Sequence, residues 1–179
     1  MPQILIVLSA VIALLSVGRT ASSQAAQVPP RLTFAFELRV QVGAPVEMGD
    51  VPGGRRRIIP ILGGTFAGPQ IKGKVLPGGA DWQYVRPDGA WELQAKYTLQ
   101  TDDGVLILVE NRGVRYGKPE VMERLAKGEK VDADQIYCRT VATFEAPRDS
   151  KYAWMNHTLF VGSVERLPDA AIVRFYKVD

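Results

Sequence analysis

Two carboxylates embedded in apolar runs are the residues of this chain best suited to chemistry. Asp81 begins one alternating run and Glu145 ends another. A carboxyl group that is buried in a fold has a raised pKa, so it can take up or release a proton near neutral pH. We therefore name Asp81 and Glu145 as candidate catalytic residues.

Seven further aromatic or polar residues are candidate ligand-binding residues, because they lie in or beside predicted strands. A small-molecule pocket combines apolar and aromatic walls with a few convergent polar groups. The candidates are Trp82, Arg86, Tyr97, Arg112, Arg139, Trp154 and Asn156. The alternative is a structural network in which arginines pair with Asp or Glu and hold the sheet together without a ligand.

The sequence contains no motif for metal, nucleotide or nucleophile chemistry. His157 is the only histidine and Cys138 the only cysteine, so a zinc site would have almost no ligands. Gly63-Gly64 and Gly78-Gly79 do not lead into helices, which excludes a nucleotide-binding fingerprint. Asp102-Asp103-Gly104 lacks the spaced oxygen ligands of a calcium loop and is interpreted as a turn. We predict neither a metal nor a cofactor.

Two functions remain open for these residues. The first is an exported barrel that binds a small, mainly apolar molecule in a central cavity. The alternative is a cofactor-free isomerase, lyase, hydratase or cyclase that works by proton transfer in the same cavity. In that enzyme Arg139, Tyr97 or Asn156 would stabilise an enolate-like oxygen. A purely structural role is weaker, because polar residues are costly to keep inside a sheet without use.

Composition bounds the partners. The 179 residues carry a net charge of +3 and the basic residues are spread along the chain, which argues against nucleic acid. Only Arg55-Arg56-Arg57 forms a basic cluster. We interpret it as a solvated loop that enters a strand, and the alternative is a contact with an anion such as phosphate. The composition leaves homo-oligomer formation open.

Residues 1–25 are predicted to be a signal peptide. Ile4–Val17 is almost wholly apolar but too short to span a bilayer comfortably, and Ser23-Gln24-Ala25 supplies small residues for signal peptidase. Cleavage after Ala25 removes Arg19 and no acidic residue, so the net charge falls from +3 to +2. We expect an exported protein, periplasmic or secreted, with no stable membrane span after cleavage. A retained anchor is the alternative.

Periodicity predicts the elements that position these residues. Leu76–Gly113 is the best-patterned stretch and predicts three antiparallel strands, since Trp91, Leu93, Ala95, Tyr97 and Leu99 alternate with polar residues between turns. Further strands are predicted at Leu32–Val42, Arg57–Thr65, Pro69–Leu76, Ile136–Glu145, Trp154–Arg166 and Ala171–Val178. Residues 43–54 are predicted as a loop and Pro119–Lys127 as the one helix.

Short strands without intervening helices indicate an all-β fold. We predict a single antiparallel β-barrel of about eight to ten strands with one short helix, preceded by a linker at residues 26–31 and occupying residues 32–179. Pro60, Gly63, Gly64, Gly73 and Gly162 lie inside predicted strands, where they provide the bends that a closed sheet needs.

Four blocks in order carry a resemblance to a known family. They are RRIIPILGGTFAGPQIKGKVLPGGADWQYVRPDG, TDDGVLILVENRGVR, GEKVDADQIYCRT and the WMN…FVG segment from Trp154 to Gly162. Together they resemble the bacterial and fungal family called domain of unknown function 3237, over about Leu32–Val178. The resemblance implies a compact antiparallel β-barrel with a central cavity and no assigned reaction. Family members usually have arginine in place of His157, an aromatic residue in place of Cys138, and no export signal.

Overall fold

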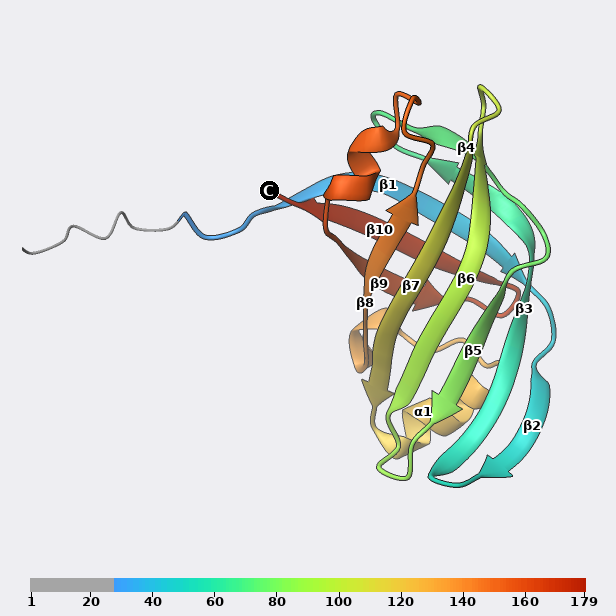
Figure 1. The fold of residues 1–179 in the computed structure, drawn as a ribbon. Helices are drawn as coiled ribbons and strands as arrows, with labels where there is room; N and C mark the ends of the chain where they lie inside the picture. The colour runs from blue at the N-terminus through green and yellow to red at the C-terminus, as the bar shows by residue number, and fades with distance from the viewer. Residues whose placement is uncertain (1–27) are drawn as a thin grey trace, which may run out of the picture.

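The sheet of this protein closes on itself into an antiparallel β-barrel (Figure 1). A computed structural model describes residues 28–179, so the predicted signal peptide lies outside the described residues. The strands are β1 (Leu32–Val42), β2 (Val46–Val51), β3 (Gly54–Ala67), β4 (Lys72–Val75), β5 (Ala80–Val85), β6 (Trp91–Thr101), β7 (Leu106–Gly117), β8 (Ile136–Glu145), β9 (Phe160–Arg166) and β10 (Ala170–Val178). The helical elements are α1 (Pro119–Ala126) and two 3-10 turns, η1 (Ala133–Gln135) and η2 (Ala153–His157).

Pairing of β1 with β3 closes the barrel. From β1 the order runs through β10, β9, β8, β7 and β6, after which β4 and β5 share one position between β6 and β3. The barrel therefore has eight strand positions, and β2 pairs with the start of β3. The predicted fold, an antiparallel barrel with one short α-helix, is confirmed.

Strand β3 changes partners along its length and so forms the seam of the barrel. On one edge its partner changes from β5, at Arg55–Pro60, to β4, at Gly64–Ala67. On the other edge the partner changes from β2, at Gly54–Ile58, to β1, at Ile61–Ala67. Pro60 cannot donate a ladder hydrogen bond and lies at this change of partner. At Gly64 φ is +145°, and a Cβ atom there would lie 2.1 Å from the carbonyl oxygen of Arg39. The irregularity predicted at these positions is therefore what lets two strands meet closely.

The predicted elements are wrong in two places. Residues 43–54, predicted as a loop, contain β2, whose mostly exposed residues give no hydrophobic pattern and which forms by pairing with β3. The predicted strand Trp154–Arg166 begins with η2 instead of extended chain. There Asn156 donates to the carbonyl oxygen of Ala146 and accepts from its N–H, at 2.9 and 2.8 Å.

The barrel interior is filled unequally along its axis. At one end Phe36, Phe144, Phe160 and Phe175 pack with ring centroids 4.8–6.3 Å apart, near Met155 of η2. α1 covers the other end (Figure 1), where its inward residues pack on those of β6 and β8. The buried set there is Trp91, Leu93, Val121, Met122, Leu125, Val131 and Cys138. Cys138 is thus a buried member of this apolar set.

No helix within residues 28–179 has the length and apolar character required to cross a membrane. The described part of the predicted linker, residues 28–31, is exposed and precedes the first strand.

Candidate functional site

A cavity of about 370 Å³ lies inside the barrel, bounded by α1, the connection at residues 43–45 and the β9–β10 turn. Strands from all around the barrel contribute inward side chains to it. Small inward residues leave this space open, for example Ala95 on β6, which lies between Asp81 of β5 and Asn111 of β7 across the strands. The volume is within the range of about 300–1,000 Å³ that small-molecule sites occupy.

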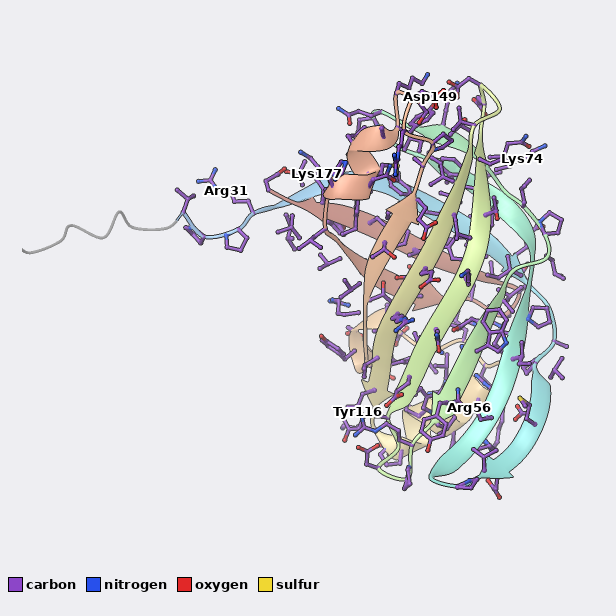
Figure 2. All side chains as sticks on the ribbon, in the orientation of Figure 1. Arg31, Arg56, Lys74, Tyr116, Asp149 and Lys177 are labelled. Atoms are coloured by element: carbon purple, nitrogen blue, oxygen red, sulfur yellow. The ribbon has the colours of Figure 1, made fainter. Side chains whose placement is uncertain are left out.

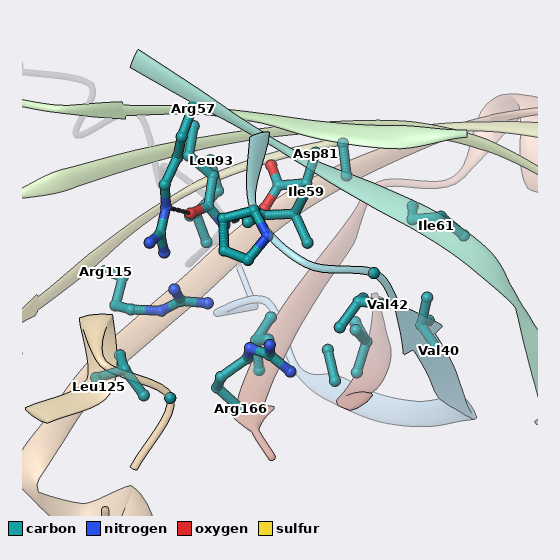
Figure 3. Close-up of a pocket in the computed structure, with 18 of the residues that line it drawn as sticks. Val40, Val42, Arg57, Ile59, Ile61, Asp81, Leu93, Arg115, Leu125 and Arg166 are labelled. Atoms are coloured by element: carbon teal, nitrogen blue, oxygen red, sulfur yellow. Dashed lines mark hydrogen bonds between the residues drawn. The ribbon is translucent and has the colours of Figure 1, made fainter. Parts of the chain in front are cut away.

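The cavity has two chemically different walls. Figure 3 shows the guanidinium groups of Arg57, Arg115 and Arg166 on the side near Leu125 of α1. Figure 3 shows the aliphatic residues Val40, Val42 and Ile61 on the opposite side, and Val173 also lines the cavity. An occupant would therefore contact polar groups at one end and hydrocarbon at the other.

A chain of hydrogen bonds connects Asp81 to the arginines. Arg57 Nε donates to Gln83 Oε1 at 2.8 Å, and Gln83 Nε2 donates to Asp81 Oδ2 at 2.6 Å. The other carboxyl oxygen of Asp81 accepts from the backbone N–H of Gln94 at 2.9 Å. Burial nevertheless raises the pKa of Asp81 above its ordinary value of 3.8, which favours the protonated carboxyl.

Three buried polar atoms on the cavity wall have no hydrogen-bond partner among the described residues. They are Tyr97 OH, Asn111 Oδ1 and Thr140 Oγ1, and all three residues line the cavity. Burial, with a smaller contribution from the Asp81 charge, raises the pKa of Tyr97 above its usual range, so its hydroxyl remains a donor. Buried polar groups in folded proteins are almost always hydrogen-bonded, so three unpaired atoms in residues of one cavity are unusual.

The three arginines differ in their protein partners. Arg57 lies over the Trp91 ring at 4.1 Å and 3.8 Å from Glu47 Oε1. Arg166 donates to the carbonyl oxygens of Leu167, Pro168 and Ala170, which fixes it to the β9–β10 turn. Arg115 is 4% exposed and lies 5.7 Å from the Trp91 ring, and among residues 28–179 it makes no hydrogen bond or ion pair.

Only two of the nine residues predicted from the sequence line this cavity. Asp81 and Tyr97 point into it. Trp82 and Arg112 also come together, but they line a hollow on the outer face of the barrel with Lys96 and Glu110. The expected convergence of the whole set on one cavity is therefore corrected.

The five other predicted residues lie elsewhere, because strand alternation or a turn directs them away. Arg139 and Glu145 are on the outward phase of β8, where Arg139 lies over the Tyr137 ring at 5.5 Å. Arg86 pairs with Asp88 and Glu92 at the β5–β6 turn. Trp154 packs on Phe160, and Asn156 binds the backbone of Ala146.

Sequence reasoning missed most of the polar wall. The missed residues are Arg57, Gln83, Asn111, Arg115, Thr140 and Arg166. A usable signal existed for several of them, because each occupies the same alternation phase as buried apolar neighbours. Asn111 and Arg115 continue the inward series of Ile107 and Val109 on β7, and Thr140 lies between Cys138 and Ala142 on β8.

The acidic and sulfur-bearing residues do not suggest a metal centre. In the described range, no three His, Cys, Asp or Glu side chains gather as a metal ion would require. Asp103, within the turn after β6, instead accepts from Tyr152 OH at 2.8 Å and pairs with Lys151 at 3.0 Å. This turn therefore connects to the loop before η2.

Comparison with known proteins identifies the family. The family model described as protein of unknown function, DUF3237, matches residues 30–178. The chain belongs to the DUF3237 family. A UPF0311 protein of Rhodopseudomonas palustris is 43% identical over 145 residues, which span 81% of this chain and 94% of the relative. A UPF0311 protein of Clostridium acetobutylicum is 44% identical over 144 residues, 80% and 90% of the two chains.

Solved structures agree with this membership. The crystal structure of the R. palustris protein of unknown function has a TM-score of 0.82 and 40% identity, covering 86% of this chain and 100% of that one. A more distant relative is the hydroalkoxylation enzyme phnH of Penicillium herquei, 26% identical over 153 residues, 84% of this chain and 85% of the relative. This DUF3237 protein is thus similar to proteins of unknown function and, more distantly, to a fungal enzyme.

Proposed function

We propose that this protein binds a small organic molecule inside its barrel. The observation that carries the proposal is that one cavity is lined by Tyr97, Asn111 and Thr140, whose buried polar atoms have no partners in the described chain. Leaving such groups unpaired costs about 1–3 kcal/mol each, so an occupant that pairs with them would be favoured. The aliphatic wall supports an organic occupant over water alone.

Native mass spectrometry of the protein purified from its own host tests this proposal. We expect a retained mass in the wild type that is absent from Ala95→Phe, because the new ring would occupy the space between Asp81 and Asn111. Gln94→Phe is the matched control, since Gln94 is the exposed neighbour on the same strand. Binding would be contradicted if wild type, Ala95→Phe and Gln94→Phe each showed only the mass of its own unliganded chain.

Catalysis by proton transfer is a second candidate, and Asp81 is the observation that favours it. Its carboxyl lines the cavity, and its pKa is raised by burial. Hydroalkoxylation, the activity in the name of the P. herquei relative, adds an alcohol across a carbon–carbon multiple bond and so moves a proton from oxygen to carbon. In this chain Asp81 would move the proton, while Arg115 and the Tyr97 hydroxyl would stabilise an enolate-like oxygen.

Proton exchange on a model enone tests the second candidate. Cyclohexenone incubated with the protein in heavy water should lose the proton signals next to its carbonyl, as followed by proton NMR. Asp81→Asn should slow this exchange by at least about a hundredfold. Asp149→Asn, in the exposed loop at the barrel end opposite α1 (Figure 2), should leave it unchanged. A rate that Asp81→Asn does not alter would remove catalysis and leave binding standing.

A further inference from the structure

We propose that the occupant of the cavity is a small organic acid, whose carboxylate binds Arg57, Arg115 and Arg166 and whose hydrocarbon body lies on the aliphatic wall. These three residues are called the arginine cluster below. The inference rests on the proposed binding function and names the chemical class of the ligand.

The charges of the lining residues favour an anionic ligand. Four of its lining residues are cationic, Arg57, Arg115, Lys127 and Arg166, whereas two are acidic, Asp81 and Asp169. Burial raises the pKa of Asp81, which disfavours its negative charge. Glu47 lies 3.8 Å from Arg57, and even when it is counted with both aspartates the described residues leave an excess of positive charge at the cavity.

The guanidinium groups of the arginine cluster repel one another. Burial first, and then the charge of Arg115, lowers the pKa of Arg57 to about 10. The same two causes lower the pKa of Arg166. Because guanidinium groups are positively charged at neutral pH, each one raises the free energy of burying the others. An anion among them would lower this free energy.

The hydrogen-bond donors of Arg115 have no acceptor among the described residues. Arg115 is 4% exposed, it points into the cavity (Figure 3), and no carboxylate or carbonyl of residues 28–179 accepts from it. Its donors are therefore available to an occupant. A guanidinium presents paired N–H groups in a plane, and this fork matches the two oxygens of a carboxylate.

The opposite wall decides between an inorganic and an organic anion. The side chains of Val40, Val42 and Ile61 offer no hydrogen bonds, and burying them against hydrocarbon is favourable. A phosphate or sulfate ion would leave this half of a 370 Å³ cavity without contacts. An amphiphilic molecule with one anionic end would contact both the arginine cluster and the aliphatic wall.

Two nearly isosteric probes test the inference directly. Isothermal titration calorimetry should show that naphthoate binds the wild-type protein at least about tenfold more tightly than naphthamide, because only the former is charged. In Arg115→Met this preference should fall below about threefold while naphthamide binding is kept. Arg112→Met is the matched control, because Arg112 is on the same strand but points outward, and it should keep the preference.

The outcomes separate this inference from the proposed function. Equal affinity of the two probes for wild type, or a preference that survives Arg115→Met, overturns the organic-acid class and leaves small-molecule binding intact. A neutral retained ligand in native mass spectrometry does the same. If neither probe binds and no ligand is retained, both proposals fail. Should Arg115→Met not fold, the wild-type comparison and Arg166→Met decide.

Discussion

Arg115 and Asp81 are ionisable residues of opposite sign on the inner surface of the same barrel. They differ in how the cost of burying their charge can be relieved. Asp81 accepts hydrogen bonds from Gln83 and Gln94 and has a raised pKa, so the cost of burying its charge can be relieved by taking up a proton. Arg115 has no comparable route, because a guanidinium stays protonated at any physiological pH. At the scale of residues, the site is therefore a cluster of cations beside an acid whose pKa is raised by burial.

Removing the Arg115 charge is expected to stabilise the empty protein. Arg115→Met keeps the apolar stem, ends the repulsion with Arg57 and Arg166, and should raise the free energy of unfolding by about 1 kcal/mol. Arg112→Met should change it by less than about 0.5 kcal/mol, since Arg112 is exposed. Urea unfolding in chloride buffer without organic anions measures both. A destabilised Arg115→Met would mean that the empty cavity already neutralises this charge.

Asp81 should give stability a pH dependence of a defined sign. Its folded pKa is raised, so between 3.8 and that raised value the native state binds more protons than the unfolded state. Stability then falls as pH rises through this window, and it is greatest where the carboxyl is protonated. Asp81→Asn should therefore lose stability relative to wild type more at pH 4 than at pH 8 in chemical unfolding. A difference that is constant with pH would show that Asp81 is not perturbed.

At the scale of elements, the seam between β1 and β3 depends on backbone approach more than on side chains. Gly64 faces Val40 across the seam and Val75 of β4 on its other side. Its positive φ and the nearby carbonyl of Arg39 leave no space for Cβ. A strand rich in glycine is intrinsically weak, yet here the glycine allows β3 to pair on both edges.

Gly64→Ala should be strongly destabilising for this reason. Backbone strain and the contact 2.1 Å from the Arg39 oxygen should together cost at least about 3 kcal/mol of unfolding free energy. Gly78→Ala is the matched control, because Gly78 also has a positive φ, +100°, but no atom within 4 Å of the new Cβ. It should cost only about 1–2 kcal/mol. Equal losses in thermal or urea unfolding would show that β1 moves aside at the seam.

At the scale of the whole molecule, the two ends of the barrel have different roles. Aromatic rings fill the end near η2, whereas the end under α1 holds the cavity and its charged groups. A filled end supplies the apolar burial that stabilises the fold, so the other end can tolerate buried charge. This division explains how one small barrel combines a stable core with a polar site.

Export remains a prediction at this scale. If residues 1–25 are a signal peptide, protein isolated from its host will begin at Ala26, and its mass will lack the first 25 residues. A chain that begins with an added Met before Ala26 should stay in the cytoplasm of that host, which is the control. Intact protein in the cytoplasmic fraction with Met1 present would contradict export.

The sequence by itself determined the barrel and most of its strands, because alternation is a local property of the chain. Leu76–Gly113 is the meander of β5, β6 and β7 that its turns and its period of two predict. The same alternation marks Tyr97 as inward. β2 escaped because an exposed edge strand is specified by its partner and not by its own residues.

Only the tertiary structure decided which polar residues meet. Arg139 on β8 is conspicuous in the sequence but faces outward, whereas Arg115 on the neighbouring strand β7 faces inward. The arginine cluster draws Arg57 from β3, Arg115 from β7 and Arg166 from β9, and successive members are 58 and 51 residues apart in the chain. Closure of the barrel brings them together, and closure depends on pairings between distant strands that no local pattern encodes.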